Sequence, residues 1–176
     1  MPPAGSSSCR ALLVYEGAGR QLVTALKFRN QRACLAPLAR AMAALVLQDS
    51  HVVATAEGVT WAPTSSERRR GRGFDQAEML ARAVAAACGL PCRGLLRRTS
   101  RGGQTGRPLV ARLEGPRFVA TRRPWSCLVL VDDVLTTGST VSAAASALRA
   151  AGARDVHGLV AAHTPPPATA TQRGRE

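Results

Sequence analysis

The stretch LVLVDDVLTTGST, residues 128–140, decides the fold. Together with Cys127 it opens on an apolar run, which predicts a parallel strand that is buried on both faces. Residues 139–151 then have the pattern of a helix that ends at Gly152, and residues 156–162 predict another strand. A strand, a loop, a helix and a second strand form a βαβ unit. The sequence therefore predicts an α/β protein with a central, mainly parallel sheet flanked by helices.

Apolar periodicity extends this pattern toward the N-terminus. Residues 19–28 and 35–46 have the spacing of two helices. The short apolar segment 58–62 predicts a strand that enters a loop, and residues 74–88 predict a helix that stops at Gly89. Between these two elements lies the arginine-rich cluster of residues 68–72, which has three interpretations: a segment that neutralises phosphates, a nucleic-acid contact, or a solvated loop. A further Gly- and Arg-rich stretch, residues 97–107, is predicted to be a mobile loop.

The length of 176 residues suits one compact domain. We expect this domain to span residues 11–163, between an N-terminal tail of residues 1–10 and a disordered C-terminal tail of residues 164–176. No apolar run approaches the roughly 20 residues that a membrane span needs. The N-terminus also lacks the features of a signal peptide, so we expect a cytoplasmic protein. The five cysteines show no C-x-x-C spacing, and we predict neither a disulfide framework nor a zinc site.

Arginine supplies nearly all of the positive charge. The chain has 24 Lys and Arg residues against 11 Asp and Glu, which gives a net charge of +13, and Lys27 is its only lysine. Such a balance attracts polyanions and phosphorylated ligands. The richness in alanine and arginine is also what a coding bias would produce. Charge alone therefore does not make this a DNA-binding protein.

The loop after the predicted strand carries the chemistry. Asp132 and Asp133 fall at the carboxyl end of the strand, where open parallel sheets bind ligands. The following helix begins with unpaired N–H groups and a partial charge of roughly +0.5, which favour a phosphate. Two carboxylates beside it can accept hydrogen bonds from a ribose diol and help to hold hydrated Mg²⁺. The candidate residues are Asp132, Asp133, Val134, Leu135, Thr136, Thr137, Gly138, Ser139 and Thr140.

Each of these residues taken alone also has a structural interpretation. Asp after a strand often caps the next helix, and Ser and Thr at a helix start are usually caps. The combination is harder to explain as capping alone. A Walker-type nucleotide hydrolase is excluded, because the string G-x-x-x-x-G-K-[ST] does not occur. We interpret Asp75 and Glu78 as structural, since acidic residues favour a helix start.

The stretch LVLVDDVLTTGST resembles the phosphoribosyl pyrophosphate signature of type I phosphoribosyltransferases. The wider pattern is similar to the ComF family within that group, over about residues 14–163. The segments that carry it are YEGAGRQLVTALKFRN, WAPTSSERRRGRGFDQAEMLA and LLRRTSRGGQTG. Two departures are visible: a cysteine-rich zinc module of many relatives is reduced to Cys9, and APTSS replaces a proline-rich VPVP loop.

The resemblance implies a type I phosphoribosyltransferase-like fold and a role for individual residues. Asp132 and Asp133 would be the catalytic pair, contacting the ribose hydroxyls and holding Mg²⁺, directly or through water. Residues 136–140 would hold the 5-phosphate. The pyrophosphate loop would consist of Pro63, Thr64, Ser65 and Ser66, together with Arg72, which the RGFDQA match ranks above its neighbours. The flexible loop that closes over the ligand would contain Arg97, Arg98, Arg101 and Gln104.

The resemblance also implies a function. A glycosyltransferase of nucleotide metabolism would bind phosphoribosyl pyrophosphate and Mg²⁺ and transfer the phosphoribosyl group to an acceptor, releasing pyrophosphate. The alternative is a non-catalytic ComF-type protein that is associated with DNA uptake in competence through nucleic-acid or protein binding. An acceptor pocket would distinguish the two, and the sequence does not identify one. A homodimer is a further expectation.

Overall fold

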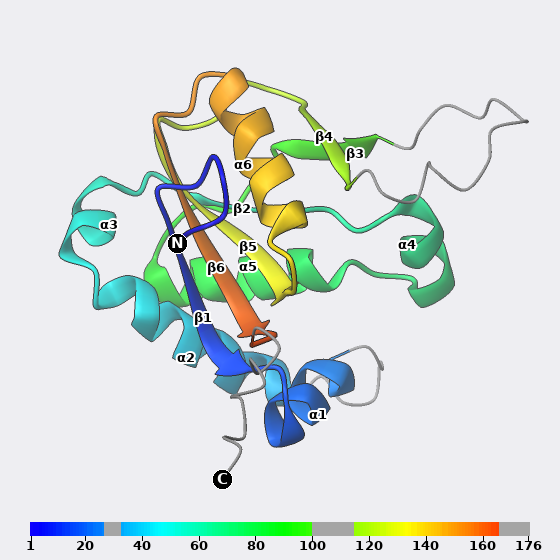
Figure 1. The fold of residues 1–176 in the computed structure, drawn as a ribbon. Coiled ribbons are helices and arrows are strands. Elements are labelled where there is room, and N and C mark those ends of the chain that lie inside the picture. The colour runs from blue at the N-terminus through cyan, green and yellow to red at the C-terminus, as the bar shows by residue number, and fades with distance from the viewer. Residues whose placement is uncertain (27–32, 100–114, 166–176) are drawn as a thin grey trace, which may run out of the picture.

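The computed structural model describes residues 1–26, 33–99 and 115–165, which form an α/β fold (Figure 1). The elements are β1 (Ser8–Val14), α1 (Gly17–Ala25), α2 (Leu35–Leu47), α3 (Ser50–Thr55), β2 (Val59–Trp61), α4 (Ser66–Arg72), α5 (Gln76–Cys88), β3 (Leu96–Thr99), β4 (Arg117–Ala120), β5 (Cys127–Leu135), α6 (Ser139–Ala150) and β6 (Asp155–His163). In these residues a parallel sheet has the order β1-β6-β5-β2, and β3 and β4 form a separate antiparallel pair. The predicted α/β class, with a central parallel sheet flanked by helices, is confirmed.

The side chains of β5 alternate between two apolar clusters, one on each face of the sheet. Val129 and Val131 belong to the cluster that contains α2 and α5. Leu128 and Leu130 belong to the cluster that contains α6 and residues of β3 and β4. Figure 1 shows α6 in front of the sheet and α5 behind it. Because helices cover both faces, β5 has the continuous apolar run of a buried parallel strand rather than alternating polarity.

Helix α5 ends at Cys88 as predicted, and it begins at Gln76, two residues later than predicted. The Asp75 side chain accepts hydrogen bonds from the N–H groups of Ala77 and Glu78, and Gly89 ends the helix with a positive φ of 69°. Glycine, and less often asparagine, adopts this left-handed backbone conformation at the end of a helix. Asp75, interpreted from the sequence as a structural residue at a helix start, is the N-cap of α5.

Strand β5 is longer than predicted, and its pairing extends further with β6 than with β2. Toward β6, parallel pairing continues past Val131 through Asp132 and as far as Leu135, because β6 itself extends to His163. Toward β2, pairing ends at Val131, opposite Trp61, where β2 stops. The two aspartates thus lie in the part of β5 beyond Val131, which pairs with β6 but not with β2.

Several segments form regular structure where the sequence predicted none, and three of them lie in regions that were expected to be a tail or a loop. Residues 8–10, expected in the N-terminal tail, belong to β1 and pair with β6 from His157 onward. Part of the arginine-rich cluster forms α4, which Ser65 caps by accepting a hydrogen bond from the Arg68 N–H. Arg97 and Arg98, predicted in a flexible loop, lie in β3, a strand with four residues paired to β4.

The rest of that loop prediction, with Arg101 and Gln104, lies outside the described residues, as does most of the predicted C-terminal tail. At its start, the Thr164 N–H donates to the Leu135 carbonyl oxygen. Across the described part of the chain, no helix combines the length and apolar composition needed to cross a membrane.

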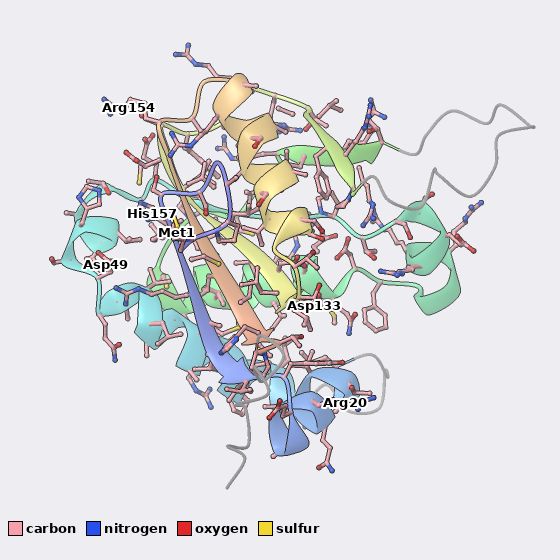
Figure 2. All side chains as sticks on the ribbon, viewed as in Figure 1. Met1, Arg20, Asp49, Asp133, Arg154 and His157 are labelled. Carbon is pink, nitrogen blue, oxygen red and sulfur yellow. The ribbon has the colours of Figure 1, made fainter. Side chains whose placement is uncertain are left out.

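His157 lies at the amino end of β6, and its surroundings lead us to expect that stability is sensitive to acid. Figure 2 shows it near Asp49, far from Asp133 at the other end of the sheet. Its Nδ1 lies 2.9 Å from the Ser8 hydroxyl, and its buried Nε2 has no hydrogen-bond partner among the described residues. Burial, the largest effect, lowers the pKa of His157 below its ordinary value. The folded state therefore favours the neutral imidazole.

We expect the free energy of unfolding to fall as the pH drops below about 6.5, because the unfolded chain then binds a proton that folded His157 resists. Urea unfolding at pH 7.5 and 5.5 measures the loss. The substitution His157→Gln is expected to reduce this pH dependence. The control His163→Gln, at the other end of β6, is expected to retain it. An equal pH dependence in wild type and His157→Gln would contradict the prediction.

Candidate functional site

A cleft of about 440 Å³ lies at the carboxyl ends of β2 and β5. Its lining residues are Tyr15, Ala62, Pro63, Thr64, Arg68, Asp75, Gln76, Ala77, Arg98, Asp132, Asp133, Val134, Thr136 and Thr140. The position follows from the topology, because α5, which follows β2 and α4, and α6, which follows β5, cover opposite faces of the sheet. Open α/β sheets bind ligands in the crevice at such a switch point. The volume is in the range of small-molecule sites.

Asp132 and Asp133 lie side by side in the wall of this cleft. One carboxylate oxygen of Asp132 accepts a hydrogen bond of 2.9 Å from the Asp133 N–H. One oxygen of Asp133 accepts a hydrogen bond of 2.8 Å from the Val134 N–H. Asp132 is 7% exposed, whereas Asp133 is half-buried. These backbone contacts fix the orientation of both carboxylates before any ligand arrives.

The electrostatics of the cleft favour a cation. Burial, followed by the negative charge of Asp133, raises the pKa of Asp132 well above its ordinary value. Burial also raises the pKa of Asp75, whose charge adds to the effect on Asp132. A cation beside these carboxylates would offset the cost of their ionisation.

Within the described residues, no three His, Cys, Asp or Glu side chains form a metal site by themselves. A pair of carboxylates nevertheless fits Mg²⁺, which keeps several waters and completes its shell with phosphate oxygens.

The N-terminus of α6 forms the second part of the site. Gly138 has a φ of 76° and precedes the helix without a side-chain cap. The Thr137 hydroxyl donates to the Ser139 hydroxyl oxygen at 3.0 Å and accepts from the Ser139 N–H at 3.4 Å. A small recess beside the main cleft is lined by Asp132, Val134, Leu135, Thr136, Gly138, Ser139, Thr140 and Val141. Helix N–H groups and hydroxyls together suit an anion.

All the residues predicted for the signature loop therefore lie in or beside one site. Asp132, Asp133, Val134, Thr136 and Thr140 line the main cleft. Leu135, Gly138 and Ser139 line the adjoining recess, and Thr137 is hydrogen-bonded to Ser139. This placement concerns position only, and the assignment of ligand groups to these residues stays a prediction.

Arg98 brings positive charge into the cleft from β3. Its guanidinium carbon lies 5.8 Å from the ring centroid of Phe118, the cross-strand partner of Arg98 in β4. Burial, and then the nearby charge of Arg68, lowers the pKa of Arg98, while Asp132 acts in the opposite direction. A guanidinium held in this way matches the geometry of phosphate oxygens. Arg97, one position earlier in the strand, is exposed and does not line the cleft.

The predicted pyrophosphate loop reaches the cleft in part. Pro63 and Thr64 line it, but Ser65 instead caps α4, and Ser66 is the first residue of that helix. The structure describes the backbone of Arg72 at the end of α4, and the role of its side chain stays a prediction.

The sequence analysis ranked Arg72 above the other arginines of its cluster, but the one that lines the cleft is Arg68. Asp75, interpreted as structural, also lines it, as do Tyr15 and Gln76, which sequence reasoning overlooked. A signal for Arg68 was present, because a serine before Glu-Arg-Arg-Arg is a helix-start pattern that would place this arginine in a first turn. No comparable local signal marks Tyr15, which follows β1.

Comparisons with known proteins identify no family. No protein-family profile matches this chain, and no curated protein matches it. A solved structure that partly matches this chain is described as the allosteric regulatory enzyme of purine biosynthesis. The two are 26% identical, with a TM-score of 0.47, and the match covers 72% of this chain and 26% of the other. The chain thus corresponds to about a quarter of the length of that enzyme.

Proposed function

We propose that this protein binds phosphoribosyl pyrophosphate with Mg²⁺ and transfers the phosphoribosyl group to an acceptor, with release of pyrophosphate. The observation that carries the proposal is the meeting, in one cleft, of Asp132 and Asp133 with the uncapped N-terminus of α6. Paired carboxylates accept hydrogen bonds from a diol, and a helix N-terminus binds a phosphate. The resemblance of residues 128–140 to the phosphoribosyl pyrophosphate signature supports the same ligand.

The cleft suggests a direction for the ligand. In our proposal the 5-phosphate occupies the N-terminus of α6, and the ribose diol contacts Asp132 and Asp133. The pyrophosphate then extends toward Thr64, Arg68 and Arg98, which lie on the other segments that line the cleft. This arrangement pairs each anionic end of the ligand with donors or cations and the neutral diol with acceptors.

The reaction that we propose needs no covalent nucleophile from the protein. The bond from ribose C1 to the pyrophosphate oxygen breaks, and the acceptor forms a new bond to C1. Arg68 and Arg98 would stabilise the charge on the departing pyrophosphate, while the carboxylates hold the ribose in line. Bound Mg²⁺, held by Asp132 and Asp133 directly or through water, would supply further neutralisation of the pyrophosphate.

Calorimetric titration with phosphoribosyl pyrophosphate tests the binding step. We expect saturable binding that is strong with Mg²⁺ and weak with EDTA, and weaker binding of ribose 5-phosphate and of pyrophosphate alone. Release of pyrophosphate in the presence of a panel of nucleobases and amines would then identify the acceptor class. Absence of binding to all three ligands with Mg²⁺ would refute the proposed function.

A specific observation favours a second candidate, the non-catalytic ComF-type protein associated with DNA uptake. Arginines outside the cleft, including Arg69 and Arg70 on α4 and Arg97 on β3, are exposed. They add to a net charge of +13. DNA binding measured across salt concentrations tests this candidate, since phosphate contacts give a steep salt dependence. A steep slope without any sugar-phosphate binding would favour it over the transferase.

A further inference from the structure

Asp75 joins two segments that form the same wall of the cleft. One oxygen of its carboxylate accepts a hydrogen bond of 2.8 Å from the Thr64 N–H, in the loop after β2. The other oxygen accepts from the N–H groups of Ala77 and Glu78, at 3.1 and 3.4 Å, in the first turn of α5. The residue is 4% exposed, and it lines the cleft together with Thr64.

We propose that Asp75 is a positioning residue for the pyrophosphate end of the cleft, where it fixes the loop of Pro63 and Thr64 against α5. The inference rests on the proposed function, because it assumes that pyrophosphate binds beside this loop. Asp75 would act through the loop backbone and would not itself contact the ligand.

The arrangement exceeds what a helix cap requires. A cap needs a single side-chain oxygen, and serine or asparagine provides one. Here the second oxygen is committed to a backbone group eleven positions earlier in the chain. Burying a carboxylate is also costly, and burial raises the pKa of Asp75. A position that only capped α5 would not need a buried charge.

The loop is held at three successive places, and Asp75 provides the middle one. The Ala62 N–H donates to the Val131 carbonyl oxygen at 3.0 Å, which fixes the start of the loop to β5. Ser65 then accepts from the Arg68 N–H at 3.3 Å, which fixes the start of α4. Because Arg68 follows directly from this loop, its place in the cleft depends on the Thr64 anchor. The cradle at α6 is instead organised by bonds between Thr137 and Ser139.

Two substitutions separate the loop contact from the cap. Asp75→Asn has one acceptor oxygen, which we expect to face the two N–H donors of α5. Its NH₂ group would then face the Thr64 N–H, and two donors cannot form a hydrogen bond. Asp75→Ser also has a single side-chain oxygen, which keeps a good cap of α5 and leaves the Thr64 N–H without the second carboxylate oxygen. Glu78→Gln is the matched control, since it removes a negative charge from the same helix turn and does not line the cleft.

Calorimetry on the full chain would compare three probes with Mg²⁺: inorganic pyrophosphate, ribose 5-phosphate and phosphoribosyl pyrophosphate. We expect both Asp75 variants to weaken pyrophosphate and phosphoribosyl pyrophosphate about tenfold, the value of one hydrogen bond to a charged group. Ribose 5-phosphate binding is expected to stay unchanged, as is every affinity in Glu78→Gln. Circular dichroism melting would verify that each variant remains folded.

The outcomes that overturn the two proposals differ. Suppose that wild type binds the probes. If the Asp75 variants then have wild-type affinities, or if their affinities for pyrophosphate and for ribose 5-phosphate fall equally, the positioning role is wrong while the transferase proposal stands. If wild type binds none of the probes, the proposed function itself fails.

Discussion

The double variant D132N/D133N is expected to bind phosphoribosyl pyrophosphate with Mg²⁺ about 100-fold more weakly than wild type, or worse. Each substitution replaces a carboxylate by an amide of the same shape, so the diol loses an ionised acceptor and the metal loses a charge. A hydrogen bond to a charged group is worth about 1.5–3 kcal/mol, and about 1.4 kcal/mol corresponds to a factor of ten. Calorimetry measures the affinity, with each single variant expected to show roughly a tenfold loss or more.

The same substitution at Asp132 is expected to make the protein more stable. Because the pKa of Asp132 is raised in the folded state, folding is penalised as the pH increases through that raised pKa. At acid pH, where the carboxyl is protonated in both states, the penalty is absent. Asn cannot ionise, so Asp132→Asn should melt at a higher temperature than wild type near pH 7, and this difference should shrink at low pH.

Loss of affinity together with increased stability would separate a binding role from a structural one. Asp155→Asn, at the amino end of β6, is the matched control and should leave ligand affinity unchanged. Unaltered binding in D132N/D133N would remove the main support for the ribose site. A variant that bound poorly because it had unfolded would contradict the expected stability.

Truncation of Leu130 to alanine is expected to reduce the free energy of unfolding by about 2–5 kcal/mol, the usual cost of a large-to-small change in a core. Leu130 has no exposed surface and lies in β5 within the cluster that joins the sheet to α6. Single domains are stable by only about 5–15 kcal/mol, so the change is a large fraction of the total. Urea unfolding with an unchanged m-value measures it.

Leu47→Ala provides the comparison for this prediction. Leu47 is 55% exposed at the end of α2. Its truncation should change the free energy of unfolding by less than about 0.5 kcal/mol, as is usual for surface positions. Equal effects at the two leucines would mean that β5 is not the centre of the core.

The sequence predicts those parts of this molecule whose determinants are local. The unit of β5, α6 and β6 was predictable because a buried strand, a helix start and a glycine stop follow one another within forty residues. The aspartates and the cradle at α6 belong to that same unit, so their proximity also follows from the sequence. Helix α5 was predictable for a similar reason, since its cap and its stop adjoin its apolar face.

The remaining parts depend on partners that lie far away in the chain. Residues 8–10 become a strand only because His157 and its neighbours in β6 supply a pairing edge. Arg98 enters the cleft only because β4 pairs with β3 and places Phe118 beneath its guanidinium. Neither sequence segment has a strong preference of its own, and tertiary context decides such cases.

Because β5 pairs with β6 over a longer range than with β2, the choice of substitution at position 132 matters. On the side of β2, the Val129 N–H donates to Gly58, but β2 ends before it could supply an acceptor for the Asp133 N–H. The Asp133 N–H donates instead to the Asp132 carboxylate, so a side-chain oxygen replaces the backbone carbonyl that a longer β2 would have provided. Alanine at position 132 would leave the Asp133 N–H without its acceptor and would also remove a ligand contact, so its effect could not be assigned to either loss. The protein has thus combined the termination of its sheet and the recognition of its proposed ligand in one side chain.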